Sequence, residues 1–357
     1  MRRRRYFLLN ACVTATACLW LCAAIVAAQV PPAVRVFSGK LGDKYRIQMQ
    51  LRREGARLSG TYFYERVRQN IALRGEIDGQ DNFTLREYDS GGAQTGVFKG
   101  KWQPSDCEGC GDYLSGNWSR PDGTRLMPFS LTPYAVAFRG PLKLMTHALG
   151  EKNRKGQPEY EITIEYPQLE GGSGASVLRF NEIIRGKAIK ALADYRKDSL
   201  ENGDRGEFGL SYEVGLANDD LVSVNLISYS HYEGAGSHTI VSETINYDLQ
   251  QGRLIKLNEL FLSGSDYQKL LREYSLRDLK KQYQDEAPEM DKEVRRQVEE
   301  VVGYESTWTI TLEGLGLVFD WPNTGPTTII VPYQALAKVI RPGGPLAKLA
   351  ARGPDNK

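Results

Sequence analysis

Leu58-Ser-Gly-Thr-Tyr62 is one of five copies of an apolar-x-Gly-x-apolar pattern in the first third of the chain. The other copies are Phe37-Ser-Gly-Lys-Leu41, Leu73-Arg-Gly-Glu-Ile77, Phe98-Lys-Gly-Lys-Trp102 and Leu114-Ser-Gly-Asn-Trp118. Because side chains alternate across a strand, each glycine faces the same side as its two apolar neighbours. A glycine on the buried face marks a bend or the close approach of another strand. Repeated over eight or so short strands, the pattern predicts a closed or strongly curved antiparallel β-barrel.

This barrel-like domain is expected to cover residues 29–138, where alternating apolar segments are separated by turns such as Arg53-Glu-Gly55. Two interpretations of its interior remain open. The barrel either holds a ligand, as calycin-type barrels do, or is filled by its own Tyr, Phe and Trp side chains. A barrel of this strand number can be just full, which favours the filled interior.

Residues 142–342 mix strands and helices, and we expect an α+β domain with helices on one side of an antiparallel sheet. A strand at Tyr160–Tyr166 precedes an apolar stripe of helical spacing through Val177, Phe180, Ile184, Ile189, Leu192 and Tyr195. A meander follows at Phe208–Leu216, Leu221–Tyr232 and Thr239–Leu249, with a turn at Asn218-Asp-Asp220.

The remaining elements are two helices, closing strands and a short final helix. Ser265 and Asp266 are expected to cap the first helix, and a second carries an apolar stripe from Met290 to Val301. Strands are predicted at Trp308–Phe319 and Thr327–Val331, a helix from Pro332 to Ile340, and a polar tail at 343–357.

The N-terminus has the features of a secretory signal. Four arginines, Arg2 to Arg5, precede an uncharged run from Ala11 to Ala28 that ends in small residues. We expect residues 1–28 to be a signal peptide and the mature chain to begin at Gln29, in the periplasm or outside the cell. The alternative is an uncleaved segment that anchors the protein to the cytoplasmic membrane, because eighteen apolar residues just reach the length of a span.

Charge and cysteine content limit the classes of partner. Removing residues 1–28 takes away four of the 46 basic residues and none of the 44 acidic ones, so the mature chain has a small negative charge. Neither nucleic acid nor an anionic membrane is therefore expected as partner. Cys107 and Cys110 lie in a glycine-rich loop, and in an oxidising compartment we expect them to form a disulfide.

The stretch Tyr229-Ser-His-Tyr-Glu-Gly-Ala-Gly-Ser-His238, together with Ile245–Leu249 and Ile329–Leu336, resembles a domain of unknown function. That domain forms the extracellular part of lysozyme-sensing anti-sigma-V factors and a non-catalytic part of a peptidoglycan deacetylase. The resemblance spans residues 142–342. It implies a protein-binding domain, for which a c-type lysozyme is the leading partner. The binding residues that it suggests are Tyr229, His231, Tyr232, Glu233, His238, Asp320 and Trp321.

Catalytic signatures are scarce in this sequence. It has three histidines without His-x-x-x-His spacing and lacks a Gly-x-Ser-x-Gly elbow or a phosphate loop. His231, Glu233 and His238 share one predicted hairpin and could hold zinc. We favour the alternative, in which the glycines form the turn and His238 bonds to nearby backbone carbonyls, so neither metal nor cofactor is expected. Asp219 and Asp220 are interpreted first as a turn.

The sequence therefore predicts an exported cell-envelope binding protein without catalytic activity. Its partner is expected to be a lysozyme-like enzyme, or alternatively cell-wall glycan or a small ligand. An envelope hydrolase that uses a carboxylate pair is the alternative of another class. Glu233, Asp219 and Asp320 are the acidic groups expected to steer a basic partner.

Overall fold

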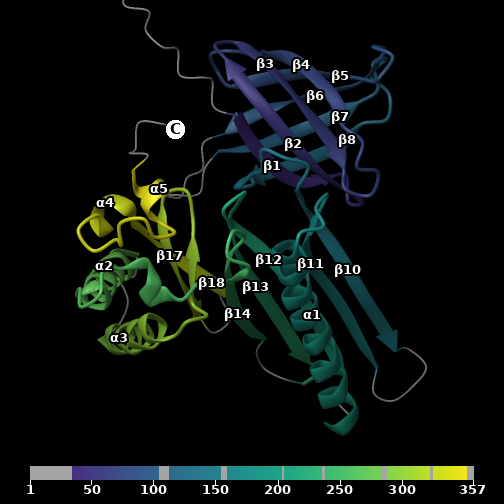
Figure 1. The fold of residues 1–357 in the computed structure, drawn as a ribbon. Coiled ribbons are helices and arrows are strands. Elements are labelled where there is room, and N and C mark those ends of the chain that lie inside the picture. The colour runs from purple at the N-terminus through teal and green to yellow at the C-terminus, as the bar shows by residue number, and fades with distance from the viewer. Residues whose placement is uncertain are drawn as a thin grey trace, which may run out of the picture. The chain divides into compact units, whose positions relative to one another are not determined.

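The computed structural model describes residues 34–103, 112–153, 159–202, 205–234, 238–282, 288–321 and 325–351. The predicted signal peptide and the pair Cys107 and Cys110 lie outside these residues. The first eight strands form a closed antiparallel barrel in sequence order, drawn in purple and blue in Figure 1. They are β1 (Val34–Leu41), β2 (Tyr45–Glu54), β3 (Arg57–Tyr64), β4 (Ile71–Ile77), β5 (Asn82–Tyr88), β6 (Gln94–Gln103), β7 (Tyr113–Ser119) and β8 (Met127–Pro133).

The five glycines of the repeated pattern lie where two barrel strands come unusually close. A Cβ atom built at each would meet a carbonyl oxygen of the adjacent strand at 1.8–2.2 Å, far inside van der Waals contact. The closest approach is at Gly75, 1.8 Å from the oxygen of Thr84. The close strand approach predicted from the spacing is thus present, and β1 pairs with β8 to close the barrel.

Aromatic and aliphatic side chains of the barrel's own strands pack its interior. Tyr62, Phe98 and Phe129 form successive edge-to-face contacts, with ring centres 5.2 and 5.3 Å apart. Buried Glu87 accepts hydrogen bonds from the hydroxyl of Tyr62 at 2.6 Å and from the indole N–H of Trp118 at 2.9 Å. This buried carboxylate thus has two donors to compensate its lost hydration.

The second part of the chain contains a mixed sheet with the strand order β10-β11-β12-β13-β14-β15. Helix α1 runs across one face of this sheet (Figure 1). Its elements are β10 (Lys143–Asn153), β11 (Tyr160–Glu170), α1 (Ala175–Asn202), β12 (Gly206–Asn218), β13 (Leu221–Tyr232), β14 (Thr239–Asp248) and β15 (Arg253–Leu254), and β9 (Val136–Ala137) pairs with β12.

The observed sheet differs from the expected antiparallel sheet in one strand pair. Helix α1 links β11 to β12 as a crossover, so these two strands are parallel. Its buried face contains Phe180, Ile184 and Ala188, whereas Ile189, which we placed in the apolar stripe, is 46% exposed. Ile189 follows Ala188 by 100° around the helix axis, and this turns it away from the sheet.

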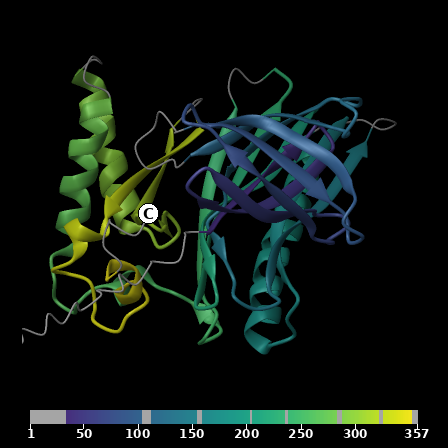
Figure 2. The same cartoon turned by 90° about the horizontal axis from the view of Figure 1, so that it is seen from above.

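The last third of the chain forms a three-stranded antiparallel sheet with helices against it. Figure 2 shows the two longer helices, in green, side by side next to these strands. The elements are η1 (Leu257–Leu260), α2 (Tyr267–Gln282), α3 (Pro288–Gly303), β16 (Trp308–Ile310), β17 (Gly314–Trp321), β18 (Gly325–Pro332), α4 (Tyr333–Leu336) and α5 (Ala347–Ala350).

The Ser265 hydroxyl donates to the carbonyl of Leu262 at 2.7 Å, in the turn before α2. Two other details in this region differ from the sequence-based expectations. Helix α4 ends at Leu336, short of Ile340, which instead forms an isolated β-bridge with Phe261. In the expected polar tail, Leu346 is fully buried in the core beneath α2 and α3.

Candidate functional site

The β10–β15 sheet has two different faces. On β13, Val222, Val224 and Leu226 belong to the core beneath α1. Because side chains alternate along a strand, Asn225, Tyr229 and His231 project from the opposite face. We call this opposite face of β11–β14 the open face.

At one end of the open face, Tyr229, His231 and His238 form a compact cluster. The Tyr229 hydroxyl lies 2.9 Å from Nδ1 of His238, at hydrogen-bond distance. The rings of His231 and His238 have centres 4.7 Å apart and an interplanar angle of 57°. Nδ1 of His231 is buried and has no hydrogen-bond partner among the described residues. The structure thus brings together three of the side chains predicted to bind.

Two other predicted residues lie apart from this cluster. Tyr232 projects from the α1 face, where its ring stacks on Tyr195 with centres 5.4 Å apart. Glu233 follows the strand and is largely exposed, with its carboxylate 3.9 Å from Arg205. Because side chains along β13 alternate between the two faces of the sheet, Tyr232 and His231 point to opposite faces although they are neighbours in sequence.

Asp320 lies at the outer edge of β14, close to the open face. Its Oδ2 accepts the backbone N–H of Ser242 at 2.8 Å, while its Oδ1 is buried without a partner among the described residues. This hydrogen bond pairs the backbone N–H of Ser242, which would otherwise be unpaired at the edge of β14. Trp321 follows on β17 and is paired with Gly325; its side chain lies outside the described residues.

Two glutamates that the sequence reasoning missed stand on the open face of β12. The strand register places Glu207 opposite His231 and Glu213 opposite Asn225. Both side chains are exposed, and within the described part of the chain neither forms an ion pair with a basic residue. Although Glu213 is exposed, neighbouring atoms partly desolvate its carboxylate, and this desolvation raises its pKa. The alternation of polar and apolar residues over Gly206–Val214 was the sequence signal for this acidic strand face.

The inner part of the open face is covered by β16, which is held by polar side chains of the sheet. Asn246 donates through Nδ2 to the carbonyl of Trp308 at 2.7 Å. The backbone N–H of Trp308 donates to Thr244 Oγ1 at 3.2 Å, and that of Ile310 to Ser223 Oγ at 2.8 Å. These buried polar groups therefore have a structural role in docking β16.

Asp219 lies at the far end of the sheet from the histidine cluster. The twelve residues of β13 separate the two ends by roughly 35–40 Å at about 3.3 Å per residue. The carboxylate of Asp219 accepts the Nε–H of Arg139 at 2.7 Å, and this hydrogen bond lowers its pKa. Asp219 is therefore neutralised by Arg139 and distant from Tyr229.

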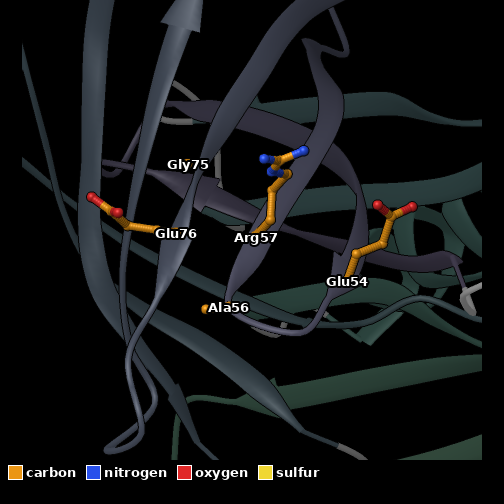
Figure 3. Close-up of a pocket in the computed structure, with 5 residues that line it drawn as sticks. All are labelled: Glu54, Ala56, Arg57, Gly75 and Glu76. Carbon is orange, nitrogen blue, oxygen red and sulfur yellow. The ribbon is translucent and has the colours of Figure 1, made fainter.

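The barrel surface carries a shallow hollow of about 460 Å³, shown in Figure 3. Arg57 stands between Glu54 and Glu76, with which it pairs across neighbouring strands. These side chains are exposed and can be hydrated by water, so none of them needs a ligand to satisfy a buried polar group.

Two further findings concern the described residues as a whole. Among them, no group of three or more His, Cys, Asp or Glu side chains is arranged to hold a metal ion. No described helix combines the length and apolar character required to cross a membrane.

The chain thus consists of a closed eight-stranded barrel followed by an α+β region whose sheet is covered by a helix on one face. No protein-family model matches the chain. No curated protein matches it either. Its structural neighbours include proteins of the DUF3298 family, a domain of unknown function.

One neighbour is a DUF3298 member from Bacteroides fragilis, with 14% sequence identity and a TM-score of 0.43, covering 60% of this chain and 99% of the other. Another is a DUF3298 protein from Pseudomonas aeruginosa, with 18% identity and a TM-score of 0.39, covering 56% of this chain and 95% of the other. The association with anti-sigma-V factors or a peptidoglycan deacetylase stays a prediction.

Proposed function

We propose that this chain is an exported, non-catalytic binding protein of the cell envelope, and that its open face binds a basic protein. A c-type lysozyme is the first partner to test. The observation that carries the proposal is the pair of exposed carboxylates, Glu207 and Glu213, without a basic partner in the described structure. They flank Tyr229, whose ring offers contact area at small entropic cost.

The charge distribution supports a basic protein over an acidic or neutral one. In the described part of the chain, Glu207 and Glu213 form no ion pair with a basic residue, so positive side chains of a partner could pair with them. Asp219 does not contribute to this surface, because Arg139 already holds its carboxylate at the other end of the sheet. We therefore assign the steering role to Glu207 and Glu213, and Asp320 at the outer edge of β14 is a third acidic group on this side of the sheet.

The first prediction is that the chain binds c-type lysozyme with micromolar or tighter affinity. Surface binding assays at about 0.1 M and about 1 M salt should show an association rate that falls as salt screens the charges. Glu207→Gln combined with Glu213→Gln should weaken binding by about tenfold, because both uncompensated carboxylates are lost.

The matched control is Glu54→Gln combined with Glu76→Gln, which removes the same charge from the barrel surface and should leave the affinity unchanged. Equal loss in both double variants would show that net charge, not the open face, drives association. Equal binding of cytochrome c, a basic protein unrelated to lysozyme, would contradict lysozyme as the specific partner. Sedimentation with insoluble peptidoglycan tests the alternative ligand, cell-wall glycan.

A further inference from the structure

Two of the three histidines in the chain meet on the open face, although seven positions separate them in sequence. His231 ends the regular part of β13, and His238 immediately precedes β14. The third, His147, lies on β10 and bonds through Nε2 to Glu170 at 2.8 Å. His147 is thus paired with a carboxylate of β11, towards the other end of the sheet's strand order, while the other two imidazoles lie next to each other.

The spacing of the two rings fits a shared metal ion. Two imidazoles bound to one Zn²⁺ at about 2.0–2.1 Å, with a ligand angle between about 90° and 109°, have ring centres roughly 4.5–5.2 Å apart. The observed separation is 4.7 Å, and the rings are tilted by 57° instead of stacked in parallel. The separation of the two ring centres is therefore compatible with a shared metal ion.

The hydrogen bonding of the pair leaves nitrogen atoms available. The hydroxyl of Tyr229 lies at hydrogen-bond distance from Nδ1 of His238 and orients that ring. Nε2 of His238 then remains available to bind a metal ion. Among the described residues, the buried Nδ1 of His231 has no hydrogen-bond partner, and a buried imidazole nitrogen without one costs free energy unless something binds it. Glu207, opposite His231 in the strand register, adds negative charge that favours a cation.

From this geometry we propose that His231 and His238 bind one divalent transition-metal ion of the Zn²⁺, Ni²⁺ or Cu²⁺ type. Both imidazoles are ligands, Tyr229 positions His238, and water molecules complete the coordination. Imidazole prefers these metals over Ca²⁺ and Mg²⁺, which take oxygen ligands. The inference does not depend on the proposed protein partner.

The test is titration of metal-stripped protein, carrying no histidine tag, with Zn²⁺ and with Ni²⁺ by isothermal calorimetry. We expect saturable binding of one ion per chain and a raised melting temperature in its presence, because the ion binds the folded state. His231→Ala and His238→Ala should each abolish saturable binding. Tyr229→Phe keeps both ligands and should weaken it by about tenfold.

The control is His147→Ala, which removes the remaining histidine and should leave the stoichiometry and affinity unchanged. Circular dichroism of each variant separates loss of a ligand from loss of the fold. Absence of saturable binding to the folded wild-type chain would overturn the proposal. Binding that persists in the folded His231→Ala, His238→Ala double variant would overturn it as well. An unchanged metal affinity of the Tyr229→Phe variant would contradict the orienting role of Tyr229.

Discussion

At Gly75 the neighbouring barrel strand leaves no room for a side chain. A Cβ atom there would lie 1.8 Å from the carbonyl oxygen of Thr84 and 2.9 Å from Cα of Leu85. Backbone atoms cannot move aside as a flexible side chain can, so a substitution must push two paired strands apart. Gly79, in the following turn, has no atom within 4 Å of its Cβ position.

We therefore predict that Gly75→Ala destabilises the barrel by about 3 kcal/mol through steric overlap with the paired strand. Gly79→Ala should change the free energy of unfolding by no more than about 0.5 kcal/mol. Chemical denaturation of both variants measures the difference. Similar stabilities would mean that close strand approach is not the reason for glycine in the repeated pattern.

At the scale of elements, strand β16 is joined to the larger sheet by side chain to backbone hydrogen bonds instead of a strand ladder. Ser223 has a central place in this contact, because its Oγ accepts the N–H of Ile310 and donates to Oδ1 of Asn246 at 2.6 Å. Ser223, Asn246 and Thr309 are all buried, so a lost partner would not be replaced by bulk water.

Ser223→Ala is therefore expected to cost about 1–3 kcal/mol, since it leaves the buried N–H of Ile310 without an acceptor. Hydrogen exchange at the Ile310 amide should become faster in this variant. The matched control is Ser211→Ala, an exposed serine on β12, whose effect should stay within about 0.5 kcal/mol. Unaltered exchange at Ile310 in Ser223→Ala would contradict the docking role.

At the scale of the whole molecule, the apolar cores are separate. The barrel core draws all its buried residues from positions between Phe37 and Leu131. The buried residues of the core beneath α1 and of the core beneath α2 and α3 begin at Leu144, although the linker residues Tyr134 to Leu142 pack against these cores. Since the barrel also closes its own hydrogen-bond ladder, it contains what a domain needs to fold.

A fragment of residues 29–138 is thus predicted to fold alone. Its far-ultraviolet circular dichroism should show β-structure that melts cooperatively, because all eight strands and the whole barrel core are included. Trp102 and Trp118 are both buried in that core and should give a blue-shifted fluorescence maximum. A fragment with an unfolded spectrum would show that the barrel depends on the rest of the chain.

Much of the fold followed from local periodicity. The repeated glycine pattern and alternating apolar residues predicted the barrel, and the 3.6-residue period located α1. The turn at Asn218 was also correct: its Oδ1 accepts the N–H of Asp220 at 2.8 Å. Strand β10 was not recognised, since Lys143–Asn153 is an edge strand with a weak alternation of buried and exposed residues.

The binding candidates depended more on tertiary structure. Sequence alternation along β13 already separates Tyr232 from Tyr229 and His231, because side-chain direction within one strand is a local property. Which strands become neighbours is decided by long-range pairing, and this alone placed Glu207 opposite His231 and Asp320 beside Ser242. The approach of His231 to His238 likewise needed the hairpin register, because local periodicity orients side chains on a strand but does not specify what lies across from them.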